Sequence, residues 1–436
     1  MEPNDYHRVD GDDGEKEVSF STYVDEAYGG ASSMDEAIWV RDMLQKKYAI
    51  TWRFEWQNML GFGVEEEPGK PLAFTSAKYT RSLVEKFLPG ESKPERSSAS
   101  RDTITKLHEV VLPELDGPED LAMRGMQSSA RSLCGGIGHL TRGRVDLSVD
   151  HALCSQHVAR PSYEVYEHLK EQLRFAWATE DSAISFPGTI NGIPINGSVV
   201  KYHEPIRPYD AEIFYGLEAI GDAAHVTPQA TVPASKSMGG LSIRLAGGPL
   251  EWCSFRFHTI TTDSTSAETL VATRAAMRLV YYRRLMQHNR IILLGPSPLF
   301  TDNDGVWYVA RDAMATTRML YVIRHVRMLQ QAEYDGEITT FQVDGVLNPT
   351  DALTKWLQAR TRVHHNLFLA GYPEAARRVW QASKAFATFK PKKITPVPRP
   401  PPVDPNMDAM LNLEATRLSN DAQVVLQEEA ARTNLA

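Results

Sequence analysis

From residue 213 onward, short apolar segments of strand length alternate with longer segments of helical periodicity. The order along the chain is strand, hairpin, helix, strand, helix, strand and helix. Apolar residues recur every two positions in a half-buried strand and every 3.6 positions in an amphipathic helix, so the two kinds of segment can be told apart. Their alternation predicts an α/β domain over residues 211–372, with a mixed five-stranded sheet and flanking helices.

Turn and capping residues set the limits of these elements. The turn GGP at 247–249 separates two strands, and the segment TDSTSAE at 262–268 is rich in N-cap residues. A long helix follows and ends near His288. The side chains expected to face the core from this helix are Leu270, Met277, Val280 and Tyr281. The five predicted strands are 213–220, 237–245, 250–257, 298–301 and 338–343.

Four acidic residues stand at the ends of these predicted elements. Asp222 and Asp302 each follow a strand. Glu268 lies in the first turns of the long helix, and Asp351 opens a later helix. Hydrolysis of a phosphodiester bond by two divalent ions needs several carboxylates at one point, because hard ions prefer oxygen ligands. The chain holds 55 acidic residues among 436, so four acids in this order carry little weight without further signals.

Short strings around these acids supply such signals. In order and spacing they resemble the ribonuclease H domain of copia-type retrotransposon Pol polyproteins. The strings are LEWCS at 250–254, STSAE at 264–268, TDN at 301–303 and DALTK at 351–355. The resemblance implies a ribonuclease H-like fold in which Asp222, Glu268, Asp302 and Asp351 are the catalytic metal ligands. It also implies two Mg²⁺ ions, which Mn²⁺ can replace, and cleavage of the RNA strand of an RNA–DNA hybrid.

The resemblance continues upstream and covers about residues 18–372. YVDE at 23–26 is similar to the palm box of the reverse transcriptase in the same polyproteins, and later landmarks follow in order. These landmarks are MLG at 59–61, AKY at 77–79, TRGRVD at 141–146 and RPS at 160–162. The resemblance implies a truncated palm and thumb remnant at 1–100 and a mostly helical connector at 101–210.

Two departures from the family pattern affect function. The palm box usually ends in two aspartates, whereas here Asp25 is followed by Glu26, and the fingers and a further palm aspartate would lie before Met1. We therefore interpret Asp25 and Glu26 as a vestigial polymerase box and expect no polymerase activity. The family usually carries a histidine between the third and fourth acids. Here His325 is the candidate accessory residue.

Residues 373–436 resemble no family. The segment is rich in Pro and Lys near Pro400–Pro402, which predicts a linker followed by a polar helical tail. A protein that binds the Pro-rich tail is one candidate partner, and an upstream polymerase segment is the other.

Two alternative functions stay open from the sequence. One is a catalytically inactive, domesticated transposon fragment that binds nucleic acid or protein, an idea that the altered palm box supports. The other is an integrase-like transferase on the same fold. That class places a glutamate on the last helix, so Asp351 disfavours it.

Composition limits the partners and the compartment. A net charge of −8 gives no overall basic field, so a nucleic acid would need a local groove of Lys and Arg. Three cysteines without a CxxC pair indicate neither a disulfide framework nor a thiolate zinc site, which favours an intracellular location in cytoplasm or nucleus. His139, His151 and His157 lack companion ligands at metal-binding spacing, and we interpret them as structural. The charged start and the lack of a long apolar run predict a soluble protein without a membrane partner.

Overall fold

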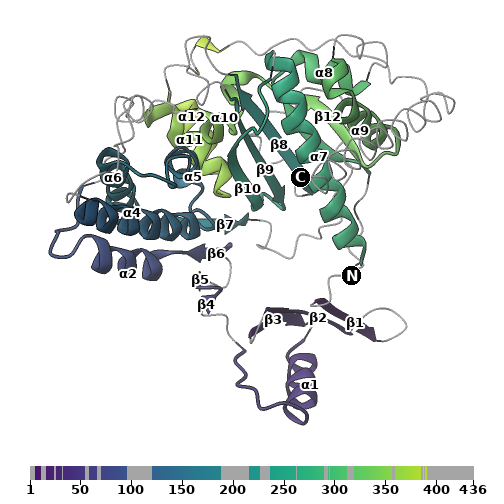
Figure 1. Ribbon diagram of the computed structural model, residues 1–436. Coiled ribbons are helices and arrows are strands. Elements are labelled where there is room, and N and C mark those ends of the chain that lie inside the picture. The colour runs from purple at the N-terminus through teal and green to yellow at the C-terminus, as the bar shows by residue number, and fades with distance from the viewer. Residues whose placement is uncertain are drawn as a thin grey trace, which may run out of the picture.

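The described part of the chain folds around three β-sheets and a set of helices (Figure 1). The computed structural model describes residues 5–10, 16–23, 26–31, 33–54, 58–65, 70–95, 120–187, 216–225, 236–261, 263–288, 293, 295–311, 319–355, 359–383, 386 and 388–389. The proline-rich linker and the polar helical tail predicted after residue 389 lie outside these residues.

The largest sheet has five strands in the order β10-β9-β8-β11-β12. The central strand β8 pairs antiparallel with β9 and parallel with β11. The outer pairs are β9–β10, which is antiparallel, and β11–β12, which is parallel. This arrangement confirms the predicted mixed five-stranded sheet. The strands are β8 Leu217–Ala224, β9 Met238–Leu245, β10 Gly248–Arg256, β11 Ser297–Thr301 and β12 Ile338–Gln342.

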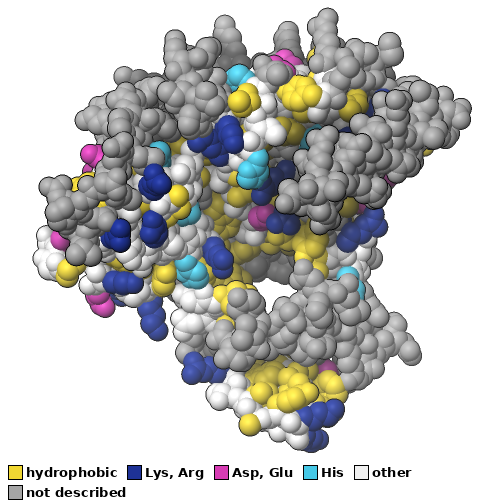
Figure 2. All heavy atoms as spheres, in the orientation of Figure 1, with side chains coloured by type: hydrophobic (Ala, Val, Ile, Leu, Met, Phe, Trp, Pro, Cys, Tyr) yellow, Lys and Arg dark blue, Asp and Glu magenta, His cyan; other side chains and the backbone are white. Residues whose placement is uncertain are grey.

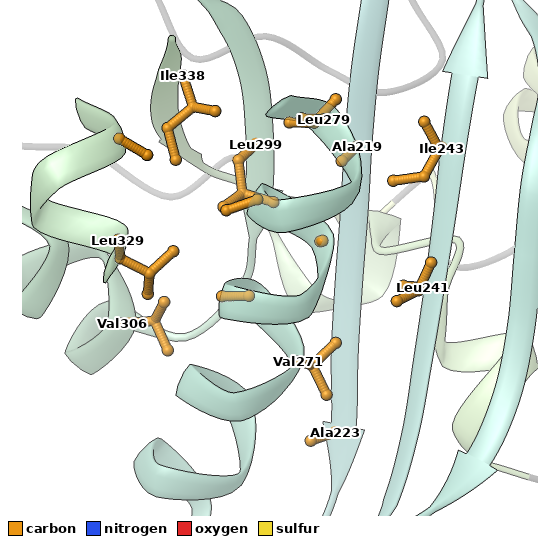
Figure 3. Packing of buried hydrophobic residues seen from close by; sticks show 14 of the residues in the cluster. Ala219, Ala223, Leu241, Ile243, Val271, Leu279, Leu299, Val306, Leu329 and Ile338 are labelled. Carbon is orange, nitrogen blue, oxygen red and sulfur yellow. The ribbon is translucent and has the colours of Figure 1, made fainter. Parts of the chain in front are cut away.

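Helices α7, α8 and α9 cover one face of this sheet and enclose its main core (Figure 3). The long helix α7 buries Val271, Leu279 and several alanines, whose small side chains let the helix lie close to β8 and β9. The prediction that Met277 and Tyr281 of this helix face the core is wrong, because the two residues are 57% and 40% exposed. The elements are α7 Ser264–His288, α8 Asp304–Arg311, α9 Ile323–Tyr334 and the 3-10 turn η5 Leu320–Val322.

Helices α10, α11 and α12 pack on the other face. Ala376 and Trp380 of α12 share a core cluster with Ile220 of β8 and Phe300 of β11. The packed core therefore continues beyond residue 372, where the sequence predicts the domain to end. The elements are α10 Asp351–Thr354, α11 Ala359–Leu369, α12 Pro373–Gln381 and the 3-10 turn η6 Gly345–Leu347.

A second core lies among four helices beside the sheet (Figure 1). Helix α4 contains glycines where neighbours approach closely: a Cβ on Gly136 would lie 2.8 Å from a methyl group of Leu83, and one on Gly138 would lie 2.9 Å from the ring of His151. The cluster joins residues on both sides of position 100, so the domain limit expected there stays a prediction. The helices are α2 Ala77–Phe87, α4 Asp120–Leu140, α5 Ser148–Ser155 and α6 Tyr163–Ala178.

A four-stranded antiparallel sheet adjoins these helices. Its order is β4-β5-β6-β7, so the last strand comes from beyond α6 and pairs with β6. This strand was not predicted in the connector. The strands are β4 Asn58–Met59, β5 Phe62–Glu65, β6 Leu72–Thr75 and β7 Ala183–Phe186.

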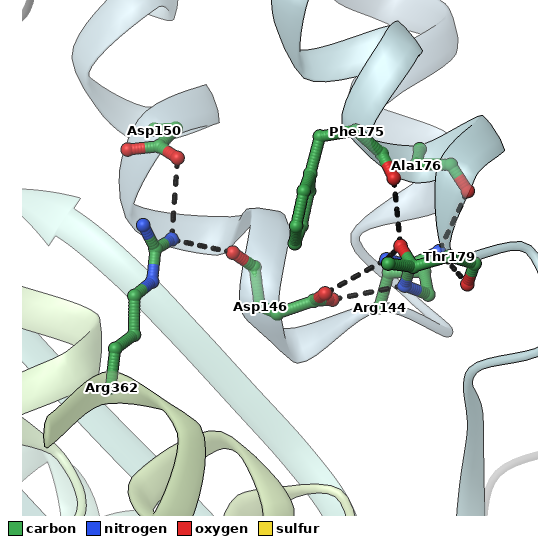
Figure 4. Close-up of polar contacts among 7 residues, drawn as sticks. All are labelled: Arg144, Asp146, Asp150, Phe175, Ala176, Thr179 and Arg362. Carbon is green, nitrogen blue, oxygen red and sulfur yellow. Dashed lines mark hydrogen bonds and ion pairs between the residues drawn. The ribbon is translucent and has the colours of Figure 1, made fainter. Parts of the chain in front are cut away.

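We call the helices α2, α4, α5 and α6 the helical unit. Two buried arginines connect segments within this unit and join it to helix α11, which packs on the sheet (Figure 4). Arg144 forms a two-pronged pair with Asp146 at 3.0 and 2.8 Å and donates to the Ala176 and Thr179 carbonyls. Arg362 of α11 donates to the Asp146 carbonyl at 2.6 Å and to Asp150 Oδ2 at 3.2 Å. The TRGRVD segment and its 3-10 turn η1, Val145–Leu147, are thus where helices and sheet meet.

The N-terminal segment forms a three-stranded antiparallel sheet and one helix. Ser33 caps the helix by accepting a hydrogen bond from the Glu36 amide, as a serine at this position commonly does. The elements are β1 Asp5–Asp10, β2 Lys16–Tyr23, β3 Glu26–Ala31 and α1 Met34–Gln45. Within the described residues, no helix has the length and apolar character needed to cross a membrane.

Candidate metal centre

Asp222 lies within the central strand β8, which continues to Ala224, and not after the strand as the sequence predicts; it is only 1% exposed. Successive side chains on a strand point to opposite faces, so Asp222 shares the face of Ile220, on the side of α10. The Thr354 hydroxyl at the end of α10 donates a hydrogen bond to Asp222 Oδ2. The short helix therefore holds one carboxylate oxygen in place.

Sheet register brings Asp302 beside Asp222. Strands β8 and β11 run parallel with Phe300 opposite Ile220, and each aspartate follows two residues later. Asp351, the first residue of α10, completes the group. One carboxylate oxygen from each of the three residues lies within 4.8 Å of the other two. We call these residues the acidic triad.

Glu268 lies in the first turns of α7, which covers the opposite face of the sheet from α10, and its carboxylate comes close to Asp222 and Asp302. Asp263 fixes the start of this helix, because its Oδ1 accepts from the Ser266 amide at 2.8 Å. Glu268 is 6% exposed, and its carboxylate accepts a hydrogen bond from the backbone of Ala223. Burial, followed by the charges of Asp222 and Asp302, raises the pKa of Glu268 to about 10.

Two of the other acids, Asp302 and Asp351, also have a raised pKa. Burial and the neighbouring Asp222 raise the pKa of Asp302 and bring the pKa of Asp351 to about 7. The Lys355 ammonium opposes both shifts. It lies 2.6 Å from Asp351 Oδ1 and 3.4 Å from Asp222 Oδ2. The site as a whole therefore has a deficit of positive charge.

The acidic triad could hold a metal ion. Its ligands are all carboxylate oxygens, the type that hard divalent ions prefer. Asp222 Oδ1 is buried without a hydrogen-bond partner among the described residues, which is costly for a carboxylate oxygen unless a cation compensates it. The donor set thus fits a divalent ion, although it does not select one metal.

Comparison with curated proteins finds similarity to a "Retrovirus-related Pol polyprotein from transposon RE2" of Arabidopsis thaliana. The two sequences are 20% identical over 314 residues, which is 72% of this chain and 19% of the plant polyprotein. The chain thus spans about a fifth of the length of this curated relative. No family model and no solved structure matches the chain. The similarity supports a relationship to transposon Pol polyproteins.

His325 is exposed on α9, where its carbonyl accepts from the Thr273 hydroxyl, and it does not belong to the acidic triad. Asp25 lies outside the described residues, and Glu26 is the first residue of β3. His139 stacks on Phe62 with ring centroids 5.3 Å apart, in agreement with a structural role.

Sequence reasoning missed several residues that shape the site. Thr354 and Lys355 belong to the DALTK string, but their contacts depend on where α10 lies. Asn348 is fully buried, and its Oδ1 accepts from the Thr350 amide at 3.2 Å and hydroxyl at 2.6 Å. Asn348 therefore holds the loop that delivers Asp351. Only the NPTDALTK string at 348–355 marks this segment in the sequence.

Proposed function

We propose that this chain is a metal-dependent ribonuclease that cuts the RNA strand of RNA–DNA hybrids. The observation that carries the proposal is the convergence of Asp222, Asp302 and Asp351 at one point beside the central strand β8. The strand order β10-β9-β8-β11-β12 is consistent with a ribonuclease H-like fold. The similarity to a transposon Pol polyprotein supports the same proposal. So does the resemblance of the strings around the acids to those of copia-type ribonuclease H domains.

In this proposal the four acids hold two Mg²⁺ ions, which Mn²⁺ can replace. When bound, the ions supply an activated water and stabilise the leaving 3′ oxygen. Asp222 is the candidate to contact both ions, because it neighbours each of the other three acids. Glu268 is the candidate to contact a ribose 2′-hydroxyl, the group that distinguishes RNA from DNA. His325 stays a proposed accessory residue.

The substrate would need a local basic surface, since the net charge is −8. Figure 2 shows Lys and Arg side chains in the region of the helices α2 and α4 on the face that it presents. Some arginines near the sheet pair with acids and are buried, so they cannot contact the phosphates of a hybrid. Arg283 is 7% exposed and pairs with Glu337 at 2.7 Å, so it serves the fold. On α2, Arg81 and Lys86 are exposed, so this side of the molecule is the proposed place for backbone contacts to a hybrid, although Arg81 also pairs with Glu180.

The test is to incubate the purified full chain with a labelled RNA–DNA hybrid. We expect cleavage of RNA in Mg²⁺ or Mn²⁺ and none in chelator, while Ca²⁺ should substitute poorly. Hybrid binding without cleavage at any Mg²⁺ concentration would favour the inactive binding module instead. Equal cleavage in chelator would reject the metal-dependent route.

A further inference from the structure

Lys355 places a positive charge inside the acidic triad. Its Nζ atom lies 2.6 Å from Asp351 Oδ1 and 3.4 Å from Asp222 Oδ2. These two residues are also two of the three that could hold a metal ion. The ammonium therefore makes contacts that a bound cation would make.

Of the groups in this site, Lys355 has the most freedom to move. Its side chain is 41% exposed, whereas the side chains of Asp222 and Asp351 are 1% and 17% exposed. A lysine side chain is a flexible four-carbon stem, so its ammonium can swing into water at modest cost. The Thr354 hydroxyl, in contrast, fixes Asp222 from the side of α10.

We propose that Lys355 is a tethered cation that holds Asp222 and Asp351 together in the metal-free chain and is displaced when a divalent ion binds. The inference rests on the metal centre proposed above. An ion on the same oxygens would put two positive charges side by side in a poorly hydrated site, where their repulsion is strong. Metal binding therefore includes the cost of moving the lysine out.

This role predicts effects of opposite sign on two measurable quantities. Removal of the ammonium leaves the carboxylates to repel one another, so the metal-free chain becomes less stable. The same removal frees the carboxylates for an ion, so divalent metal binds more tightly. A lysine that merely supported the fold would, when removed, lower both stability and metal affinity.

The experiment uses the full chain and its Lys355→Met variant. Mn²⁺ binding is measured by calorimetry, and thermal unfolding is followed in chelator. We expect Lys355→Met to bind Mn²⁺ on the order of tenfold more tightly or better, with a lower unfolding temperature in chelator. Lys355→Arg keeps a cation and should retain an affinity close to that of the native chain.

Two controls separate this inference from the metal centre itself. Lys170→Met removes the same charge from α6, where Lys170 pairs with Glu167 at 2.8 Å, and should leave Mn²⁺ affinity unchanged. Asp222→Asn should lose Mn²⁺ binding. If the native chain and Asp222→Asn bind Mn²⁺ equally, the proposed metal centre is wrong.

The inference on Lys355 is decided separately. If Lys355→Met binds Mn²⁺ no more tightly than the native chain, and binding still depends on Asp222, the displacement of Lys355 by the ion is wrong. The proposed metal centre would be unaffected by that result. Binding by Lys355→Met but not by the native chain would support it. Should Lys355→Met fail to fold, Lys355→Gln is measured against the same expectation, because glutamine removes the charge and keeps a polar end group.

Discussion

At the scale of single residues, the site concentrates acidic side chains where water is largely excluded. Glu268 and Asp351 both have a raised pKa because of burial and because of the neighbouring Asp222. Clusters of this kind are common at functional sites, since a structural role alone seldom offsets the repulsion. The four acids thus repel one another in the metal-free fold, and a cation held by the acidic triad would relieve this repulsion.

Replacing one acid at nearly constant shape separates these two effects. We expect Asp222→Asn and Asp302→Asn each to abolish hybrid cleavage while the chain still folds, because each change removes the negative charge of a proposed metal ligand. Without metal, each variant relieves about 1 kcal/mol of repulsion between carboxylates, which raises the unfolding temperature by a few degrees. The metal-free variants should therefore unfold a few degrees higher than the native chain. Calorimetric scans in chelator and cleavage assays measure both. Variants that keep most of the activity would show that the site lies elsewhere.

The raised pKa values also predict how stability depends on pH. Folding raises the pKa of Glu268 from 4.5 to about 10 and that of Asp351 from 3.8 to about 7. The protonated carboxyls are favoured in the folded chain, so their contribution is fully present below the unfolded pKa and is lost as pH rises through the folded pKa. In chelator, the free energy of unfolding should therefore fall between about pH 5 and pH 9. Glu268→Gln should flatten the part of this fall above about pH 7. An unchanged slope in that variant would contradict the assignment.

At the scale of elements, the site depends on how closely α10 approaches β9. Gly240 of β9 lies opposite Asp222, and a Cβ there would be 2.6 Å from Leu353 Cβ and 2.8 Å from Thr354 Cγ2. The absence of a side chain at Gly240 lets the residues that hold Asp222 reach it. This glycine was not singled out from the sequence, because its role depends on a segment more than a hundred residues away.

Gly240→Ala should move α10 away from the sheet. We expect a loss of about 1–3 kcal/mol in the free energy of unfolding from overpacking, together with weaker Mn²⁺ binding. Gly135→Ala in α4 is a matched control, since a Cβ there meets nothing within 4 Å. That change should stabilise the chain by roughly 0.5–1 kcal/mol, the usual difference between these residues in a helix. Chemical denaturation with a parallel Mn²⁺ titration measures both, and an unaffected affinity in Gly240→Ala would reject the link between α10 and the metal centre.

The second prediction at the scale of elements concerns Arg362, which joins α11 to the helical unit. It is 7% exposed and bonds to Asp150 and to the Asp146 carbonyl. Arg362→Met should cost roughly 3–5 kcal/mol of unfolding free energy, because it leaves Asp150 buried without its partner. The exposed pair Arg174–Glu91 offers a control, and Arg174→Met should cost at most about 1 kcal/mol. Similar losses in the two variants, measured by denaturant unfolding, would mean that the junction contributes little.

At the scale of the whole molecule, the sequence predicts the sheet well and the packing between units poorly. Periodicity gave the five strands, and the order of the acids indicated which strand ends matter. The sequence pattern could not show that α12 packs on Ile220, or that β7 pairs with β6, which precedes the helical unit in the chain. Those contacts depend on the path of the chain in space. The error on α7 has a similar cause, since alanines rather than Met277 face the sheet.

The central claim is that this metal centre acts on RNA paired with DNA. Its most direct measurement compares three duplexes of one sequence, RNA–DNA, DNA–DNA and RNA–RNA, with each strand labelled in turn and with the Asp222→Asn variant in parallel. The account predicts Mg²⁺-dependent cuts in the RNA strand of the hybrid alone, lost in Asp222→Asn. Equal cleavage of the DNA duplex, or no cleavage of the hybrid by a folded chain that binds Mg²⁺, would contradict it.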